Sequence, residues 1–190
     1  GRARQRCIRD SIAILDPELT LGLPAGTTAA TGIDAMVHAI EAYASKSKNN
    51  NPISRMIAIE ALKLLGQSIE TAVLDGSNLE ARGNMLIGSM LAGKAFANSP
   101  VAAVHALAYP IGGIFHVPHG LSNSLVLPYV LRFNSVDPKA AKDYSDLAQY
   151  VFPDLDINKG TQAVCAEFID KIEDLSKRLG LPQKLREVNI

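Results

Sequence analysis

The stretch Thr31–Tyr43 reads TGIDAMVHAIEAY and decides the fold class of this 190-residue chain. Its apolar and small residues recur at helical spacing, which predicts a helix over Ala29–Ser45. Within that helix Asp34 and His38 are four residues apart, so both side chains leave the same face one turn apart. The stretch therefore predicts a largely buried helix that carries a carboxylate and an imidazole side by side.

The same helical pattern continues along nearly all of the chain downstream. Thr27 or Thr28 is expected to cap the first helix, and Pro52 stands at the first position of the second. Pro110 is expected to end the fourth helix, and Gly180 to close the last one. The expected helices span Ala29–Ser45, Pro52–Leu74, Asn78–Asn98, Pro100–Tyr109, Pro118–Leu131, Pro138–Val151 and Asn158–Leu179.

Residues 1–26 have a different character. The first nine residues hold four arginines and no acid, which is typical of a solvated lead-in and, less often, of an anion-binding arm. Ser11–Leu15 (SIAIL) predicts one short strand, stopped by Asp16 and Pro17. No strand–helix alternation and no glycine-rich phosphate-binding motif follows. The expected fold is mainly α, with 1–26 as a lead-in containing one short strand and 27–190 as a multi-helical domain.

Composition excludes several classes of function. Nineteen basic and nineteen acidic residues give a net charge of zero, which argues against nucleic acid as a partner. Two cysteines, Cys7 and Cys165, cannot form a disulfide framework. No apolar run is long enough to span a membrane and no signal peptide opens the chain, so we expect a cytoplasmic globular domain without membrane partners.

The four histidines all fall in two short apolar segments, His38 in the first and the other three between residues 105 and 119. Alone, the Asp34–His38 pair is most simply a hydrogen bond within the core. Together with His105 and His119 it forms an oxygen-and-nitrogen donor set that suits Fe(II) or Zn(II) better than Ca(II) or Mg(II). Such a site requires Asp34 and His105 to lie within about one helix diameter, ~10 Å.

Three neighbouring features have two interpretations each. Glu41, three residues after His38, is either a hydrogen-bond partner of a ligand or an ordinary surface carboxylate. His116 is either a further polar group at the mouth of the site or a solvent-exposed loop residue. The small-residue segment Gly93–Asn98, which contains Phe96, is most simply explained by close helix packing.

Several motifs in order resemble those of the iron-containing (group III) alcohol dehydrogenase family. They include Asp16–Thr20 (DPELT), Thr31–Tyr43, Gly93–Phe96 (GKAF) and His105–Gly120. The resemblance implies two domains in the family: an N-terminal α/β nucleotide-binding domain and a C-terminal helical metal domain, as in the C-terminal half of the dehydroquinate synthase-like fold. The present chain resembles the second domain, without the nucleotide-binding one.

The resemblance also implies roles for individual residues. By position, the metal ligands fall on Asp34, His38, His105 and His119. Tyr109 stands where relatives often carry a histidine implicated in proton transfer, so Tyr109 and His119 are the expected catalytic residues. The change from histidine to tyrosine puts a histidine proton relay in doubt.

The remaining implications concern cofactor and substrate. Leu19, Thr20 and Phe96 are expected to border the nicotinamide of NAD or NADP. The reaction implied is oxidation of an alcohol, or reduction of an aldehyde or ketone, by metal-polarised hydride transfer with Fe(II) or Zn(II). The implied partners are a small alcohol or aldehyde and the enzyme's own N-terminal nucleotide-binding domain, without which this chain is expected to be inactive. A homo-oligomer is compatible with the resemblance.

Three rival functions stay open at this point. One is a zinc-dependent cousin with the same fold, such as a glycerol dehydrogenase-like polyol oxidoreductase or a dehydroquinate synthase. Another is a non-catalytic, metal-stabilised helical domain, which metal retention would test. A metal-dependent phosphohydrolase would usually show an adjacent His-Asp dipeptide, and this sequence contains none.

Overall fold

The computed structural model describes residues 12–100 and 102–190, and within these ranges it contains seven α-helices and no strand. The mainly α fold is thereby confirmed. Three short 3-10 helices accompany the α-helices: η1 (Pro17–Thr20), η2 (Ile157–Lys159) and η3 (Leu185–Val188). The α-helices are α1 (Ala25–Ala44), α2 (Pro52–Leu74), α3 (Leu79–Asn98), α4 (Ala103–Phe115), α5 (His119–Asn134), α6 (Pro138–Val151) and α7 (Thr161–Arg178).

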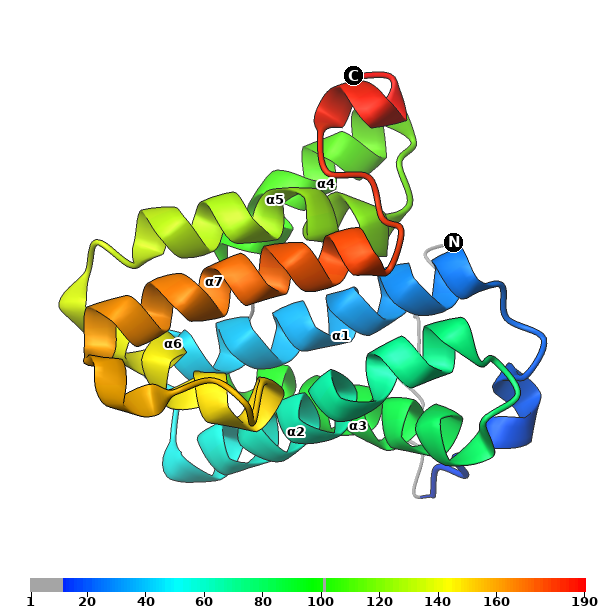
Figure 1. Cartoon of the computed structure of the whole chain (residues 1–190), viewed down its shortest axis with the longest axis horizontal. Coiled ribbons are helices and arrows are strands. Elements are labelled where there is room, and N and C mark those ends of the chain that lie inside the picture. The colour runs from blue at the N-terminus through cyan, green and yellow to red at the C-terminus, as the bar shows by residue number, and fades with distance from the viewer. Residues whose placement is uncertain (1–11, 101) are drawn as a thin grey trace, which may run out of the picture.

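Helix α1 forms the centre of the bundle. In Figure 1 it crosses the middle of the molecule, with α2 and α3 below it and α5 and α7 above it. It contacts α2, α3, α5 and α6, while α4 packs mainly on α5. The side chains of Ile33, Met36 and Ile40 are completely buried, so the middle of the helix is enclosed, while its first turn is exposed.

Small residues bring α1, α2 and α3 close together. A Cβ atom added to Gly32 would lie 2.7 Å from both Ile69 Cδ1 and Met85 Cε. One added to Gly88 would lie 2.7 Å from Leu65 Cγ. These distances are shorter than van der Waals contact, so the glycines allow the helices to approach as closely as they do.

The predicted strand at Ser11–Leu15 is wrong for the four residues of it that the structure describes. Residues 12–15 form neither helix nor strand, and Ile12 and Ile14 are 82% and 88% exposed. A lone strand leaves its backbone N–H and C=O groups without partners, and no second strand is present in the described ranges to pair with it. Ser11, the arginine-rich residues 1–9 and Cys7 lie outside the described residues.

The first helix begins earlier than predicted and lacks the expected threonine cap. Its N-cap is Pro24, with no side-chain hydrogen bond to the first turn. The hydroxyl of Thr28 instead accepts a 2.7 Å hydrogen bond from the buried guanidinium of Arg82, which also donates to the carbonyls of Leu23 and Gly76. Thr28, which local spacing predicted as a helix cap, therefore bonds a residue 54 positions away instead.

Helix α4 departs most from its predicted bounds, because it starts at Ala103 and continues through Pro110 to Phe115. The fixed φ of proline is compatible with a helix, so Pro110 removes only the hydrogen bond to the Ala106 carbonyl instead of ending the helix. The helix ends where His116 adopts a left-handed conformation with φ of 58°.

The last predicted helix is divided at Gly160, whose φ of 84° separates η2 from α7. Gly180, with φ of 75°, follows α7, and the N–H of Leu181 donates to the carbonyl of Ser176 across the helix end. The predicted glycine stop is thereby confirmed.

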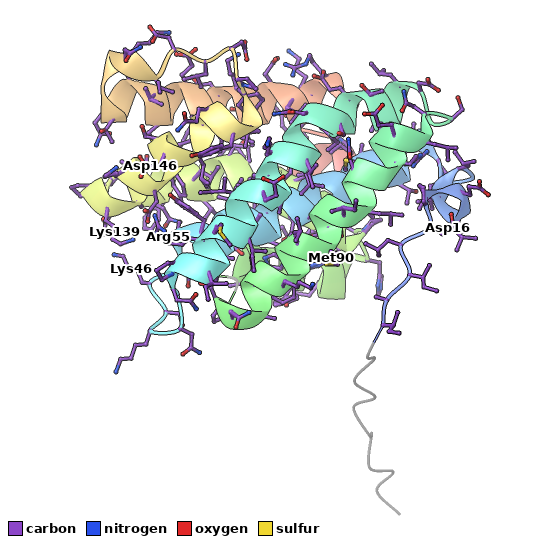
Figure 2. The ribbon with its side chains drawn as sticks, turned by 90° about the horizontal axis from the view of Figure 1, so that it is seen from below. Asp16, Lys46, Arg55, Met90, Lys139 and Asp146 are labelled. Atoms are coloured by element: carbon purple, nitrogen blue, oxygen red, sulfur yellow. The ribbon has the colours of Figure 1, made fainter. Side chains whose placement is uncertain are left out.

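Arg55 of α2 links the C-terminal end of α1 to α6. Figure 2 shows Lys46, Arg55 and Lys139 near one another at this end of the molecule. Arg55 donates to Asp143 at 2.8 Å and stacks over the ring of Tyr43 at 3.8 Å.

No helix in the two described ranges is both long and apolar enough to cross a membrane.

Candidate metal centre

Three helices bring the four predicted ligands together. The Nε2 atoms of His105 (α4) and His38 (α1) are 3.0 Å apart, and His105 Nε2 lies 3.8 Å from Asp34 Oδ1 (α1). His119 Nε2, at the start of α5, lies 3.7 Å from the same carboxylate oxygen. One potential ligand atom from each of Asp34, His38 and His105 falls within 4.8 Å of the others. The expected approach of Asp34 and His105 is thus confirmed.

His105 is the most enclosed of the four predicted ligands, with a side chain 2% exposed. Its Nδ1 atom lies 2.6 Å from a carboxylate oxygen of Glu41. An ionised carboxylate only accepts hydrogen bonds, so this contact assigns the proton to Nδ1 and leaves a lone pair on Nε2. Glu41 is itself only 7% exposed, which rules out its interpretation as a surface carboxylate.

His38 contacts two neighbouring rings. Its ring stacks with that of Phe96 of α3, with centroids 4.7 Å apart, and with that of His105, with centroids 4.5 Å apart. Burial lowers the pKa of His38 below its ordinary value of 6.5, the nearby imidazoles add to this effect, and Asp34 opposes it. His38 is therefore neutral at physiological pH, which is the form that binds a metal.

His119 and Tyr109 form the open side of the cluster. The His119 side chain is 45% exposed, and the ring of Tyr109 stacks on it with centroids 5.8 Å apart and an interplanar angle of 19°. Tyr109 is 61% exposed, so its hydroxyl is accessible from solvent. A small molecule can reach the cluster from this side.

Asn123 is a residue of the cluster that the pattern of ligand types did not single out. It is completely buried, and its side-chain nitrogen donates to Asp34 Oδ1 and lies 3.3 Å and 3.2 Å from the Nε2 atoms of His105 and His119. Its position four residues after His119 on a predicted helix is the signal that would have found it.

The donor set fits a divalent cation. The Asn123 amide nitrogen lies among three acceptors, so the point where they converge favours positive charge. With ligand bonds of about 2.0–2.2 Å, two atoms on one ion lie about 3–3.5 Å apart. The distances of 3.0, 3.7 and 3.8 Å within the cluster are close to that range.

Three other predicted residues lie outside the cluster. His116 is an exposed residue at the end of α4, which matches the second of its two interpretations. Leu19, on η1, is 84% exposed, and Thr20 lines a cavity of about 110 Å³ together with Thr31 and Arg82. Thr20 therefore lies beside the N-terminal part of α1, and η1, which carries both residues, packs on α3.

The fold and this cluster define a class of protein. Residues 28–190 match the model of the family described as "Fe-containing alcohol dehydrogenase family, C-terminal". The chain belongs to this family.

Individual relatives are similar over nearly the whole chain. It is 41% identical over 180 residues to a 1,3-propanediol dehydrogenase of Citrobacter freundii, and 34% identical over 183 residues to an NAD-dependent methanol dehydrogenase of Bacillus methanolicus. These matches cover 95% and 96% of this chain but 45% and 47% of the relatives, so the chain spans about half their length. A crystal structure of a 1,3-propanediol oxidoreductase superposes with a TM-score of 0.86 at 39% identity, covering 92% of this chain and 44% of that one.

Proposed function

We propose that this chain is the metal-binding part of an NAD-dependent alcohol dehydrogenase, in which Asp34, His38, His105 and His119 hold one divalent ion. Fe(II) is the proposed ion, because the family is named for iron, and Zn(II) suits the same donors. The observation that carries the proposal is the convergence of Asp34, His38 and His105 within 4.8 Å, with His119 3.7 Å from Asp34.

An ion held by these residues would supply Lewis acidity toward the oxygen of an alcohol or a carbonyl compound, while a nicotinamide would exchange the hydride. The residues of this chain prepare the site for that chemistry. His105 presents its Nε2 from the buried side of the cluster with the half-buried His38 beside it, and the more exposed His119 leaves one side open to a substrate. Tyr109, stacked on His119 and exposed, is proposed to hydrogen-bond the substrate oxygen or an ordered water.

The proposed cofactor is NAD, by analogy with the NAD-dependent methanol dehydrogenase of Bacillus methanolicus. We propose that Leu19, Thr20 and Phe96 border it, and that a nucleotide-binding domain preceding this chain holds its phosphates. The chain itself has no glycine-rich phosphate loop in its sequence. The cytoplasmic location, the use of NADP and a homo-oligomeric state stay predictions from the sequence.

The metal proposal is tested by elemental analysis of purified variants. His38→Ala is expected to lose the ion, with affinity reduced more than the roughly 10–100-fold that loss of a ligand's hydrogen-bond partner costs. The matched control is His116→Ala, another histidine change outside the cluster, which should keep the full metal content. A His38→Ala protein with one ion per chain would show that the ion is held elsewhere.

The cofactor proposal needs a separate variant that does not disturb the cluster. Leu19→Ala suits this purpose, because Leu19 is 84% exposed and its loss should not alter packing. In the protein that joins this chain to its nucleotide-binding domain, the variant should raise the KM for NAD several-fold and leave metal content unchanged. An unchanged KM would remove Leu19 from the cofactor site.

A further inference from the structure

Glu41 makes contacts that neither its sequence position nor the ligand set accounts for. It lies on α1 near the C-terminal end of the helix, and its side chain is 5% exposed. One carboxylate oxygen accepts from the Val104 N–H at 2.7 Å. The other accepts from the Ala102 N–H at 3.0 Å and from His105 Nδ1 at 2.6 Å. A single buried carboxylate thus receives three hydrogen bonds from one short segment of another helix.

Two of these bonds belong to the start of α4. The first turn of a helix has N–H groups without partners inside the helix, and the N-cap residue here, Ala102, has no side chain that accepts them. Glu41 takes the place of that cap from a neighbouring helix, 61 and 63 positions earlier in the chain. The carboxylate also brings negative charge to the positive end of the α4 dipole.

The third bond sets the proton of His105. Backbone N–H groups only donate, so the carboxylate between them acts purely as an acceptor, and His105 Nδ1 has to carry a hydrogen. The lone pair is then on Nε2, the atom that faces His38 at 3.0 Å and Asp34 at 3.8 Å. In the opposite tautomer, Nε2 would carry the hydrogen and direct an N–H group toward His38 and Asp34, so His105 could not bind an ion there.

We propose that Glu41 is a positioning residue that anchors the first turn of α4 and fixes His105 in the tautomer able to bind the ion. This inference rests on the proposed function, because it assumes that His105 is a ligand. It goes beyond that function by assigning the orientation and protonation of His105 to one carboxylate on α1.

The direct test is Glu41→Gln, which keeps the shape of the side chain but replaces one acceptor oxygen by an NH₂ donor. In one orientation of the amide, its NH₂ group faces the Val104 N–H. In the second, the NH₂ group faces the Ala102 N–H and His105 Nδ1. In the second orientation His105 accepts from the amide only by moving its proton to Nε2. The expected result is a 10–100-fold weaker affinity for Zn(II), measured by competition with a chromophoric chelator.

A matched control and a second readout separate positioning from general loss of structure. Glu60→Gln changes a half-exposed carboxylate on α2, whose nearest cation, Lys63, is 3.9 Å away, and should leave the Zn(II) affinity unchanged. Nitrogen-15 NMR of the histidine rings in the metal-free chain reports the tautomer directly. At a pH where each ring carries one proton, His105 should be protonated on Nδ1 in the unchanged chain, and on Nε2 in a substantial fraction of Glu41→Gln.

The outcomes distinguish this inference from the proposed metal site. If His38→Ala keeps its ion, the metal site itself is wrong. If His38→Ala loses the ion while Glu41→Gln binds Zn(II) as tightly as the unchanged chain, only the role of Glu41 is overturned. If Glu41→Gln does not fold, the NMR spectrum of the unchanged chain still decides, since a neutral His105 with its proton on Nε2 overturns the inference.

Discussion

The two sides of α1 differ in chemistry: one packs apolar side chains, and the other carries the polar groups of the candidate metal centre. The side toward α2 and α3 is apolar in its middle part, where Gly32 lets Ile69 and Met85 approach the helix directly. The side toward α4 and α5 carries Asp34, His38 and Glu41, which converge with polar groups of two further helices. Apolar burial stabilises most of the first side, with the Arg82–Thr28 hydrogen bond near the start of α1, whereas the second side brings together acceptor atoms that favour a cation.

The largest expected effect comes from supplying that charge. At a free Zn(II) concentration about 1,000 times its Kd, the free energy of unfolding should rise by about 4 kcal/mol, because the ion binds the folded chain only. Chemical denaturation with Zn(II) and with a chelator measures the difference. In Asp34→Ala the two curves should coincide, and coincident curves for the unchanged chain would contradict the comparison.

Changing a glycine tests how tightly the polar side is built. A Cβ atom on Gly120, next to His119, would overlap the Ala30 carbonyl oxygen of α1 and lie 2.8 Å from its carbon. Backbone atoms cannot move aside as side chains do, so Gly120→Ala should reduce the free energy of unfolding by about 3 kcal/mol and weaken metal binding. Thermal unfolding and metal titration measure the two effects.

The control for that change is Gly83→Ala on α3, where the added methyl group has no neighbour within 4 Å. Alanine is the better helix former, so this variant should be more stable by about 0.5–1 kcal/mol. If both variants shift stability in the same direction, the close approach of α5 to α1 does not limit the site.

The smallest expected effect concerns a buried polar group that has its own partner. The hydroxyl of Tyr144, on α6, accepts from the Asn134 side chain at 3.1 Å, and burial raises its pKa from 10.0 to about 12. Tyr144→Phe removes this hydrogen bond and should cost about 1 kcal/mol at neutral pH. Urea denaturation at pH 7 measures this loss.

The sign of the pH dependence follows from the direction of that shift. Above pH 10 the unfolded chain releases the Tyr144 proton while the folded chain keeps it, so stability falls as pH rises toward 12. The total loss from this group is on the order of 3 kcal/mol, because each pKa unit corresponds to about 1.4 kcal/mol. Tyr144→Phe should lack this component, and parallel stability curves for the two proteins would contradict the raised pKa.

Local residue patterns predicted most helix boundaries. The starts of α2 at Pro52 and of α6 at Pro138 are as expected, and the side chains of Asn51 and Asp137 cap them, because a side-chain cap and a fixed φ act within one turn. Pro110 misled the prediction, because the cost of one lost hydrogen bond inside α4 depends on how the rest of the helix is held. Packing against α5 and the contact of Glu41 with its first turn hold that helix, and neither is visible in local sequence.

The site divides in the same way. The Asp34–His38 spacing on one helix predicted their proximity, and His119 and Asn123 have the same spacing on α5. The meeting of His105 with His38, across 67 positions, depends on how α1, α4 and α5 pack. Only the structure shows where Glu41 lies, so the sequence could not decide between its two interpretations as a ligand's hydrogen-bond partner and as a surface carboxylate.

The partly buried carboxylate of Asp34 and the buried one of Glu41 also set a charge balance. Asp34 and Glu41 contribute one formal negative charge each to a cluster whose imidazoles are neutral when they bind an ion. An ion of charge +2 brings the sum to zero, whereas a monovalent or trivalent ion leaves a net charge in a poorly hydrated space, which is costly. If the proposed site binds an ion, the two carboxylates therefore favour a divalent one, although Glu41 is not among the proposed ligands.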